Sequence, residues 1–252
     1  MKSKKWLIVV MAAWMMLCMA CGKEKTYEGY LHYQVEDDVI IITGFKESSC
    51  PADVVIPEKI KGKSVTKIGD KAFNYCISLI NIKLPDSVTE IGKYAFFDCE
   101  NLISIELPDS VTKIGVQAFD SCNSLTSIEL PDSVTEIGDH AFDSCTSLTS
   151  IELPDSVTKI GKSAFSSCKS LTSIELPDSV TKIGDFAFYG CNSLTSIELP
   201  DSVTEMGESV FKFCTDLENI IIKDGSNVVR EIVLKYGEDF TAEDYFNAIG
   251  SN

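Results

Sequence analysis

The chain has 252 residues, of which 44% are hydrophobic, so it can bury a sizeable core in one large domain or two ordinary ones. Its formal net charge is −16, and a surface of that sign repels phosphate backbones, which argues against nucleic acid as a partner. Cationic peptides, basic protein patches and divalent ions are compatible with this charge.

The N-terminus has the pattern of a bacterial export signal. Lysines precede an uncharged run from Trp6 to Gly22, and these 17 residues fall short of the roughly 20 that a transmembrane helix needs. We therefore predict a secretory signal peptide over 1–20. Ala20 before Cys21 resembles the bacterial lipobox, although its leucine lies one place earlier than usual. The resemblance implies that Cys21 carries a lipid that anchors the protein in the membrane. An ordinary signal peptide and an uncleaved anchor are the alternatives.

Residues 21–67 are predicted to form the anchor linker and an N-terminal β cap. The stretch 27–67 begins with alternating aromatic and β-branched residues, which favour strands. It ends in a shortened version of the repeat that follows, with Ile56–Pro57 in place of Leu–Pro. A cap is expected because the open end of a repeat array exposes its core.

A 23-residue repeat fills residues 68–223. The dipeptide Ile–Gly recurs at 68, 91, 114, 137, 160 and 183, and Met–Gly at 206 continues the series, which gives seven units. No single unit can bury its own apolar side, so stacked units must share one continuous core. The sequence therefore predicts a repeat solenoid.

Each unit is predicted to contain one short strand and one turn. In the unit LTSIELPDSV of 125–134, Ile128 and Leu130 alternate with Ser127 and Glu129. This period of two predicts a strand that turns its serine and glutamate to water. The proline that follows ends the strand because it lacks an N–H donor. The next stretch, DHAFDSC, is long enough for one or two turns of helix.

The pattern IGxxAFxxCxxLxxIxLPxSVTx resembles the BspA-type leucine-rich repeat. It departs from the commoner leucine-rich pattern, which has Asn or Cys where Ser133 stands. The resemblance implies a right-handed leucine-rich-repeat solenoid with a parallel β-sheet on the concave face and short helical turns on the other side. It also implies a secreted or surface-displayed bacterial protein used for adhesion or recognition.

Residues 224–252 are predicted to form a helical C-terminal cap. The seventh coil loses the mixed strand pattern at Ile220–Ile222. The sequence beyond it suggests two short helices, with Asn227 and Thr241 as N-cap residues.

One column of the repeat holds seven cysteines, Cys76, Cys99, Cys122, Cys145, Cys168, Cys191 and Cys214. Cysteines of an exported protein usually pair, but these side chains would point the same way from neighbouring coils. A straight ladder also cannot supply a tetrahedral zinc site. We predict buried free thiols, with scattered disulfides or a metal as the alternatives. Cys50 has no obvious partner.

The candidate partner-binding residues form one outward column, Glu106, Glu129, Glu152, Glu175 and Glu198. In-register parallel strands would hold these like charges about 5 Å apart, which costs about 0.8 kcal/mol per pair in water. One hypothesis is an acidic stripe that binds a basic partner or Ca²⁺. The alternative is recent duplication, which copied one glutamate before selection could change it.

A second charged column mixes both signs, at Glu90, Lys113, Glu136, Lys159, Lys182 and Glu205. Opposite charges in neighbouring coils attract, so this column is expected to form an exposed and electrostatically balanced edge.

No residue is assigned to catalysis, to a metal or to a cofactor. His140 stands where other coils have Lys, Gln, Ser or Phe, so a solvated side chain is expected, and His32 lies in the cap. The sequence favours a monomeric, membrane-anchored surface lipoprotein that binds a protein or glycan on a host or neighbouring cell through its concave face. A structural spacer without a specific ligand is the alternative, and an enzyme subunit is the least favoured reading.

Overall fold

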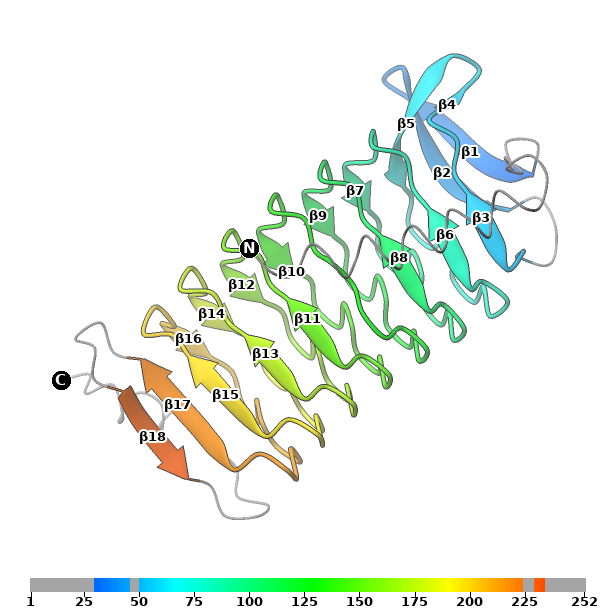
Figure 1. The fold of residues 1–252 in the computed structure, drawn as a ribbon. Helices are drawn as coiled ribbons and strands as arrows, with labels where there is room; N and C mark the ends of the chain where they lie inside the picture. The colour runs from blue at the N-terminus through cyan, green and yellow to red at the C-terminus, as the bar shows by residue number, and fades with distance from the viewer. Residues whose placement is uncertain (1–29, 46–49, 224–228, 234–252) are drawn as a thin grey trace, which may run out of the picture.

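The computed structural model describes residues 30–45, 50–223 and 229–233, and these form a β-solenoid of about eight turns (Figure 1). Each turn contributes one short strand to each of two columns that run the length of the solenoid. The predicted 23-residue unit is confirmed, because strand partners in neighbouring coils differ by 23 residues, as Ser150 and Ser173 do.

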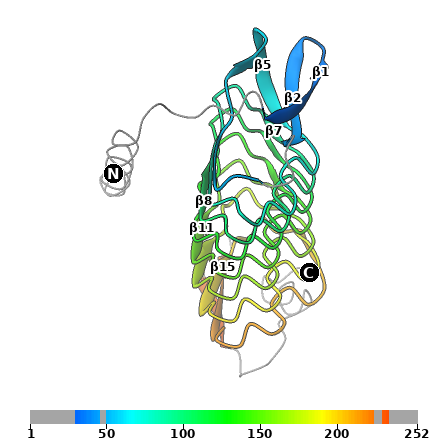
Figure 2. The same ribbon diagram turned by 90° about the vertical axis from the view of Figure 1, so that its right-hand side faces the viewer.

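The first column carries the strand predicted from the LTSIELP stretch, and we call its outward surface the glutamate face. Its strands are β3 (Asp53–Val55), β6 (Asn81–Lys83), β8 (Ser104–Glu106), β11 (Ser150–Glu152), β13 (Ser173–Glu175), β15 (Ser196–Leu199), β17 (Asn219–Lys223) and β18 (Val229–Val233). Bridges from Glu106 to Glu129 and from Glu129 to Glu152 join β8 to β11. Figure 2 shows β8, β11 and β15 stacked along one side of the solenoid.

The second column begins with three longer strands in the N-terminal part and continues with two-residue strands that follow each PDSVT segment. They are β1 (Leu31–Glu36), β2 (Val39–Phe45), β5 (Lys63–Ile68), β7 (Glu90–Ile91), β9 (Lys113–Ile114), β10 (Glu136–Ile137), β12 (Lys159–Ile160), β14 (Lys182–Ile183) and β16 (Glu205–Met206). A further strand, β4 (Lys59–Ile60), pairs antiparallel with β5. All pairs from β5 to β9 and from β10 to β16 are parallel.

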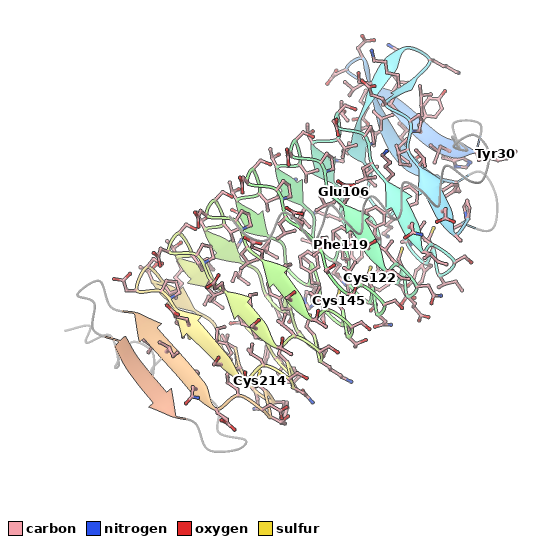
Figure 3. The ribbon with its side chains drawn as sticks, viewed as in Figure 1. Tyr30, Glu106, Phe119, Cys122, Cys145 and Cys214 are labelled. Carbon is pink, nitrogen blue, oxygen red and sulfur yellow. The ribbon has the colours of Figure 1, made fainter. Side chains whose placement is uncertain are left out.

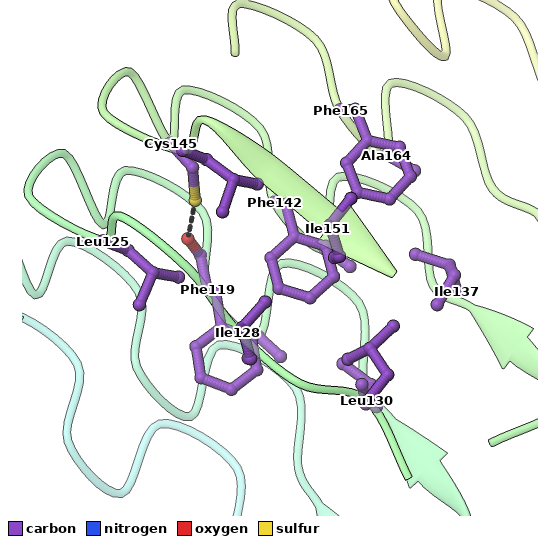
Figure 4. Close-up of a cluster of buried hydrophobic side chains, with 14 of the residues drawn as sticks. Phe119, Leu125, Ile128, Leu130, Ile137, Phe142, Cys145, Ile151, Ala164 and Phe165 are labelled. Atoms are coloured by element: carbon purple, nitrogen blue, oxygen red, sulfur yellow. Dashed lines mark hydrogen bonds between the residues drawn. The ribbon is translucent and has the colours of Figure 1, made fainter. Parts of the chain in front are cut away.

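A stack of phenylalanine rings forms the spine of the core. The fully or almost fully buried members are Phe73, Phe96, Phe119, Phe142, Phe165, Phe188 and Phe211. Successive ring centroids lie 5.2–5.6 Å apart, and the ring planes differ by no more than 4° (Figures 3 and 4). Burial of one such ring contributes about 1.5–3 kcal/mol, so every coil depends on its neighbours to cover its phenylalanine.

The helical turns predicted for the AFxxC segments are not found, since no helix occurs in the described part of the chain. Each of these segments is a tight turn with two left-handed residues four positions apart, such as His140 (φ 55°) and Ser144 (φ 58°). A right-handed helix cannot contain such residues. The N–H groups of His140, Phe142 and Ser144 instead donate to carbonyls of the next coil.

Strands form both described ends of the solenoid. The hairpin β1–β2 and the pairing of β2 with β5 agree with the predicted N-terminal β structure. At the other end β18 pairs antiparallel with β17, so the helix predicted after Asn227 is wrong over 229–233. This strand supplies hydrogen-bond partners to the edge of β17, which would otherwise be open. The helix predicted at Thr241, the signal peptide at 1–20 and Cys21 lie outside the described residues.

Candidate binding face

The five candidate glutamates lie in one register on the glutamate face. Glu106, Glu129, Glu152, Glu175 and Glu198 are successive Cα partners across the column. The first four are exposed and Glu198 is half-buried, while the isoleucine before each of them points into the core. The sequence-based prediction of this column is therefore confirmed in position and orientation (Figure 3 labels Glu106).

Other residues close the acidic column at its two ends. Lys83 pairs with Glu106 on the N-terminal side, and Ile221 pairs with Glu198 on the C-terminal side. Like charges therefore face each other at every step between these two limits. This arrangement costs the fold about 0.8 kcal/mol per step in water, and salt reduces the cost.

Hydroxyl groups border the acidic column. The Oγ1 atoms of Thr149 and Thr172 donate to the carbonyls of Thr126 and Thr149, at 3.3 and 3.2 Å. The first two coils have Ile80 and Ile103 in this position, and these side chains are 36% and 47% exposed. The border of the acidic column thus changes from isoleucine in the first two coils to threonine farther along, a change that the repeat pattern did not predict.

The second strand column confirms the predicted balance of charge. Glu90 lies 3.2 Å from both Lys67 and Lys113, and Lys182 lies 2.5 Å from Glu205. The pair of Lys159 with Glu136 is longer, at 3.7 Å. Two charged columns of the same repeat therefore behave differently, because one mixes signs and the other does not.

No metal site is formed by the side chains that the structure describes. Among them, no group of three or more His, Cys, Asp or Glu residues could hold a metal ion. Calcium sites in proteins surround the ion with several oxygen ligands, whereas the glutamate column offers one carboxylate per coil. A shallow groove of about 430 Å³ over β12, β14 and β16 is lined by lysines and acids together, including Lys162 and Asp185.

The cysteine column consists of free thiols, and all but the first are buried. Six of the thiols donate to the carbonyl of the phenylalanine 26 residues earlier, as Cys145 does to Phe119 at 3.2 Å (Figure 4). Burial raises the pKa of Cys122 and Cys168 far above the ordinary value, so these groups stay protonated. The prediction of core thiols is confirmed, whereas their hydrogen bonds were not foreseen.

A small polar cluster lies on the turn side of the third and fourth coils. Asp120 is buried and accepts hydrogen bonds from Gln117 (2.8 Å) and from Ser121 (2.9 Å). Burial raises the pKa of Asp120, and the nearby carboxylate of Asp143 adds to this effect. His140 is half-buried with its Nδ1 3.0 Å from Asp143, so the expectation of a solvated histidine is wrong. The sequence signal that was missed is the i, i+3 spacing of histidine and aspartate.

None of the described residues belongs to a helix long and apolar enough to span a bilayer.

The profile of the BspA type leucine rich repeat region matches this chain in six copies, over residues 44–149 and 135–239. A leucine-rich repeat protein of T. pallidum is 39% identical with a TM-score of 0.72, and the match covers 77% of this chain and 91% of that one. A leucine rich cell surface protein of Faecalibacterium prausnitzii is 30% identical with a TM-score of 0.68, over 86% of this chain and 62% of that one. No curated protein matches the chain.

A leucine-rich repeat protein of Bacteroides ovatus is 34% identical with a TM-score of 0.58, over 76% of this chain and 63% of that one. The chain therefore spans about three fifths of the Faecalibacterium and Bacteroides proteins.

Proposed function

The chain belongs to the BspA-type leucine-rich repeat family, and on that premise we propose that it is a recognition or adhesion module that binds its ligand through the glutamate face. The ligand is a protein or glycan that presents positive charge and lies on a host or neighbouring cell. The single observation that carries the proposal is the in-register acidic column on a solvent-facing sheet.

Three arguments support this assignment. Packing requires the buried isoleucine of each strand but not the outward glutamate, which raises the electrostatic energy of the stack. The repeat's other charged column shows that balanced signs fit the same coil geometry. A series of identical groups one coil apart also suits weak contacts that act together, because each additional contact is made at high effective concentration.

Charge reversal tests the glutamate face. The double variant Glu152→Lys and Glu175→Lys is expected to lose at least about tenfold in affinity, or 1.4 kcal/mol, for the ligands that the wild type retains in a screen of matrix proteins and cell-surface glycans. The matched control is Asp155→Lys with Asp178→Lys, which makes the same change in net charge at exposed turn residues of the same coils. Circular dichroism and thermal melting verify that both variants fold.

The two variants separate the proposed function from its alternative. Equal loss in both would mean that net charge, and not the glutamate face, governs binding. Unchanged binding in both would exclude the glutamate face as the binding surface. A wild type that retains no ligand would favour a spacer or scaffold, whose only requirement is the continuous stack.

A lipid on Cys21 would attach this module to the bacterial membrane. Cells that express the full chain are expected to incorporate labelled palmitate into the wild type and not into Cys21→Ser. Both proteins keep the same export signal at 1–20, so the variant controls for secretion. A wild type that takes up no label would exclude the anchor without affecting the proposal for the glutamate face.

A further inference from the structure

The first thiol of the cysteine column differs from the others. Six thiols donate to the carbonyl of the phenylalanine 26 residues earlier, but the residue 26 positions before Cys76 is Cys50. The side chain of Cys76 instead interacts with that of Cys50, in the shortened coil before it. Cys50, which had no obvious partner in the sequence, therefore has one in the fold.

The backbone holds the two cysteine segments together independently of the thiols. The N–H groups of Ile80 and Asn81 both donate to the carbonyl of Ala52, at 2.7 and 3.0 Å. The Asn81 side chain donates to Asp53 at 2.7 Å, where β3 and β6 pair in parallel. Because these bonds lie a few residues after each cysteine, they hold the two cysteine segments side by side in neighbouring coils.

Access and acidity set this pair apart from the deeper thiols. Cys50 and Cys76 are half-buried, whereas Cys99 and Cys191 are completely buried. The interaction between the two thiols lowers the pKa of Cys76, and together with burial it raises the pKa of Cys50. Cys191 also interacts with the thiol of Cys214, but that interaction and burial both raise the pKa of Cys191. Cys76 is thus the accessible thiol that most readily becomes a thiolate.

We propose that Cys50 and Cys76 form a disulfide that locks the N-terminal end of the solenoid when the protein meets a disulfide oxidant, either a small molecule or a protein. The Cys76 thiolate attacks one sulfur of the oxidant and releases one thiolate, leaving a mixed disulfide on Cys76. Cys50 then loses its proton and attacks the Cys76 sulfur, which releases the second thiolate. The two protein thiols lose two electrons, and the oxidant is reduced to two thiols, which take up the protons.

The disulfide would act at the N-terminal end of the solenoid, where the core is covered on one side only by the cap strands. A disulfide between Cys50 and Cys76 closes a covalent loop that contains β3, β4 and β5, the strands that cover the first full coil. The loop cannot leave the end of the core while the bond is intact. Reduction would release this restraint, so the stability of the N-terminal end would depend on the redox state of its surroundings.

The test uses the full chain with Cys18→Ser and Cys21→Ser, which leaves 10 − 2 = 8 cysteines. The folded, reduced protein is incubated with oxidised glutathione, and thiols are then titrated in denaturant and mapped by mass spectrometry of non-reduced peptides. We expect the titre to fall from 8 to 6, with the missing thiols found in one Cys50–Cys76 crosslinked peptide. The melting temperature should rise, and dithiothreitol should reverse the rise.

Three outcomes would overturn the proposal: a titre that stays at 8, a crosslink elsewhere such as Cys191–Cys214, or glutathione adducts on Cys50 and Cys76 without a crosslink. An unchanged melting temperature despite the crosslink would overturn the locking role. As a variant control, Cys50→Ser should prevent the crosslink, whereas Cys145→Ser should leave it intact. The wild-type peptide map decides the matter even if a variant fails to fold.

Discussion

Hydroxyl and thiol groups explain much of what the repeat conserves from coil to coil. The Ser156 and Ser179 hydroxyls donate to the carbonyls of Val134 and Val157, at 2.5 and 2.6 Å. The threonines of the same segment do likewise, as Thr158 does to Thr135 at 3.3 Å. Each bond contributes about 0.5–1.5 kcal/mol, so these residues have a structural reason to recur. The outward glutamate has no such bond, so function or recent duplication must account for its recurrence in the identical decamers.

The buried carboxyl group of Asp120 gives the protein a specific pH response. Its pKa in the folded state is raised above the ordinary value of 3.8, so protonation favours the folded state. The contribution of Asp120 to the free energy of unfolding therefore increases as the pH falls through the folded-state pKa, and it is lost as the pH rises again. Asp120→Asn, which carries no charge, should lack this response.

Urea unfolding of wild type and Asp120→Asn at pH 7 and near pH 4.5 measures the effect. At pH 7 the variant should have a higher free energy of unfolding than the wild type, relative to their values at pH 4.5. The advantage of the variant should shrink at the lower pH. Asp132→Asn is the control, at an exposed carboxylate of a PDSVT turn that does not contribute to the shift of Asp120. A difference between wild type and Asp120→Asn that is the same at both pH values would contradict the prediction.

At the scale of the element, the strand of each unit could be predicted and the turn could not. The alternation of Ile128 and Leu130 with polar residues determines which way each side chain points, so the position of Glu129 followed directly. The turn segment has an alanine–phenylalanine pair that fits a short helix equally well. Its left-handed positions hold residues as different as Lys71, Tyr94 and Phe186, and these types share no preference that a sequence pattern could reveal.

Glycine has a distinct role where one turn approaches the next. A Cβ atom on Gly161 would lie 2.6 Å from the backbone nitrogen of Asp139, in the preceding coil. We expect Gly161→Ala to lower the free energy of unfolding by about 1–3 kcal/mol or more, because backbone atoms must move to make room. Chemical denaturation of the purified variant measures this loss.

Gly190 provides the control. It has φ 68°, and an added Cβ would find no atom nearer than 3.8 Å. Asparagine tolerates this left-handed conformation, so Gly190→Asn should cost less than about 1 kcal/mol. Equal losses in Gly161→Ala and Gly190→Asn would contradict the prediction, because only the Cβ at position 161 meets the backbone of a neighbouring coil.

At the scale of the whole molecule, the coil is the unit of stability. Deletion of residues 148–170 removes one complete 23-residue period and joins Ser147 to Leu171 with every column still in register. The shortened protein should fold, with the same circular dichroism per residue and a free energy of unfolding lower by a few kcal/mol. Deletion of 148–159 removes about half a period and should prevent folding. Equal behaviour of the two deletions would refute the period as the structural unit.

The overall architecture was predictable because self-similarity fixed both the stacking and the register. The ends were less so, since the end strands do not follow the repeat. β18 pairs with the edge of β17, although its sequence also fits the start of a helix. Cys50 lies beside Cys76 because the coil that precedes the first repeat is shorter than the others. Both features arise from pairing between segments that no shared periodicity connects.

The hydrogen bonds between coils join each turn only to its immediate neighbours, which determines how the protein would respond to force. A force applied to both ends of the chain would break the hydrogen bonds between neighbouring coils one coil at a time. A stacked coil occupies about 5 Å of axis, whereas its 23 residues reach about 76–83 Å when extended. Each coil that peels away would therefore lengthen the protein by about 70–80 Å. The remaining coils, and the glutamates they carry, would keep their arrangement.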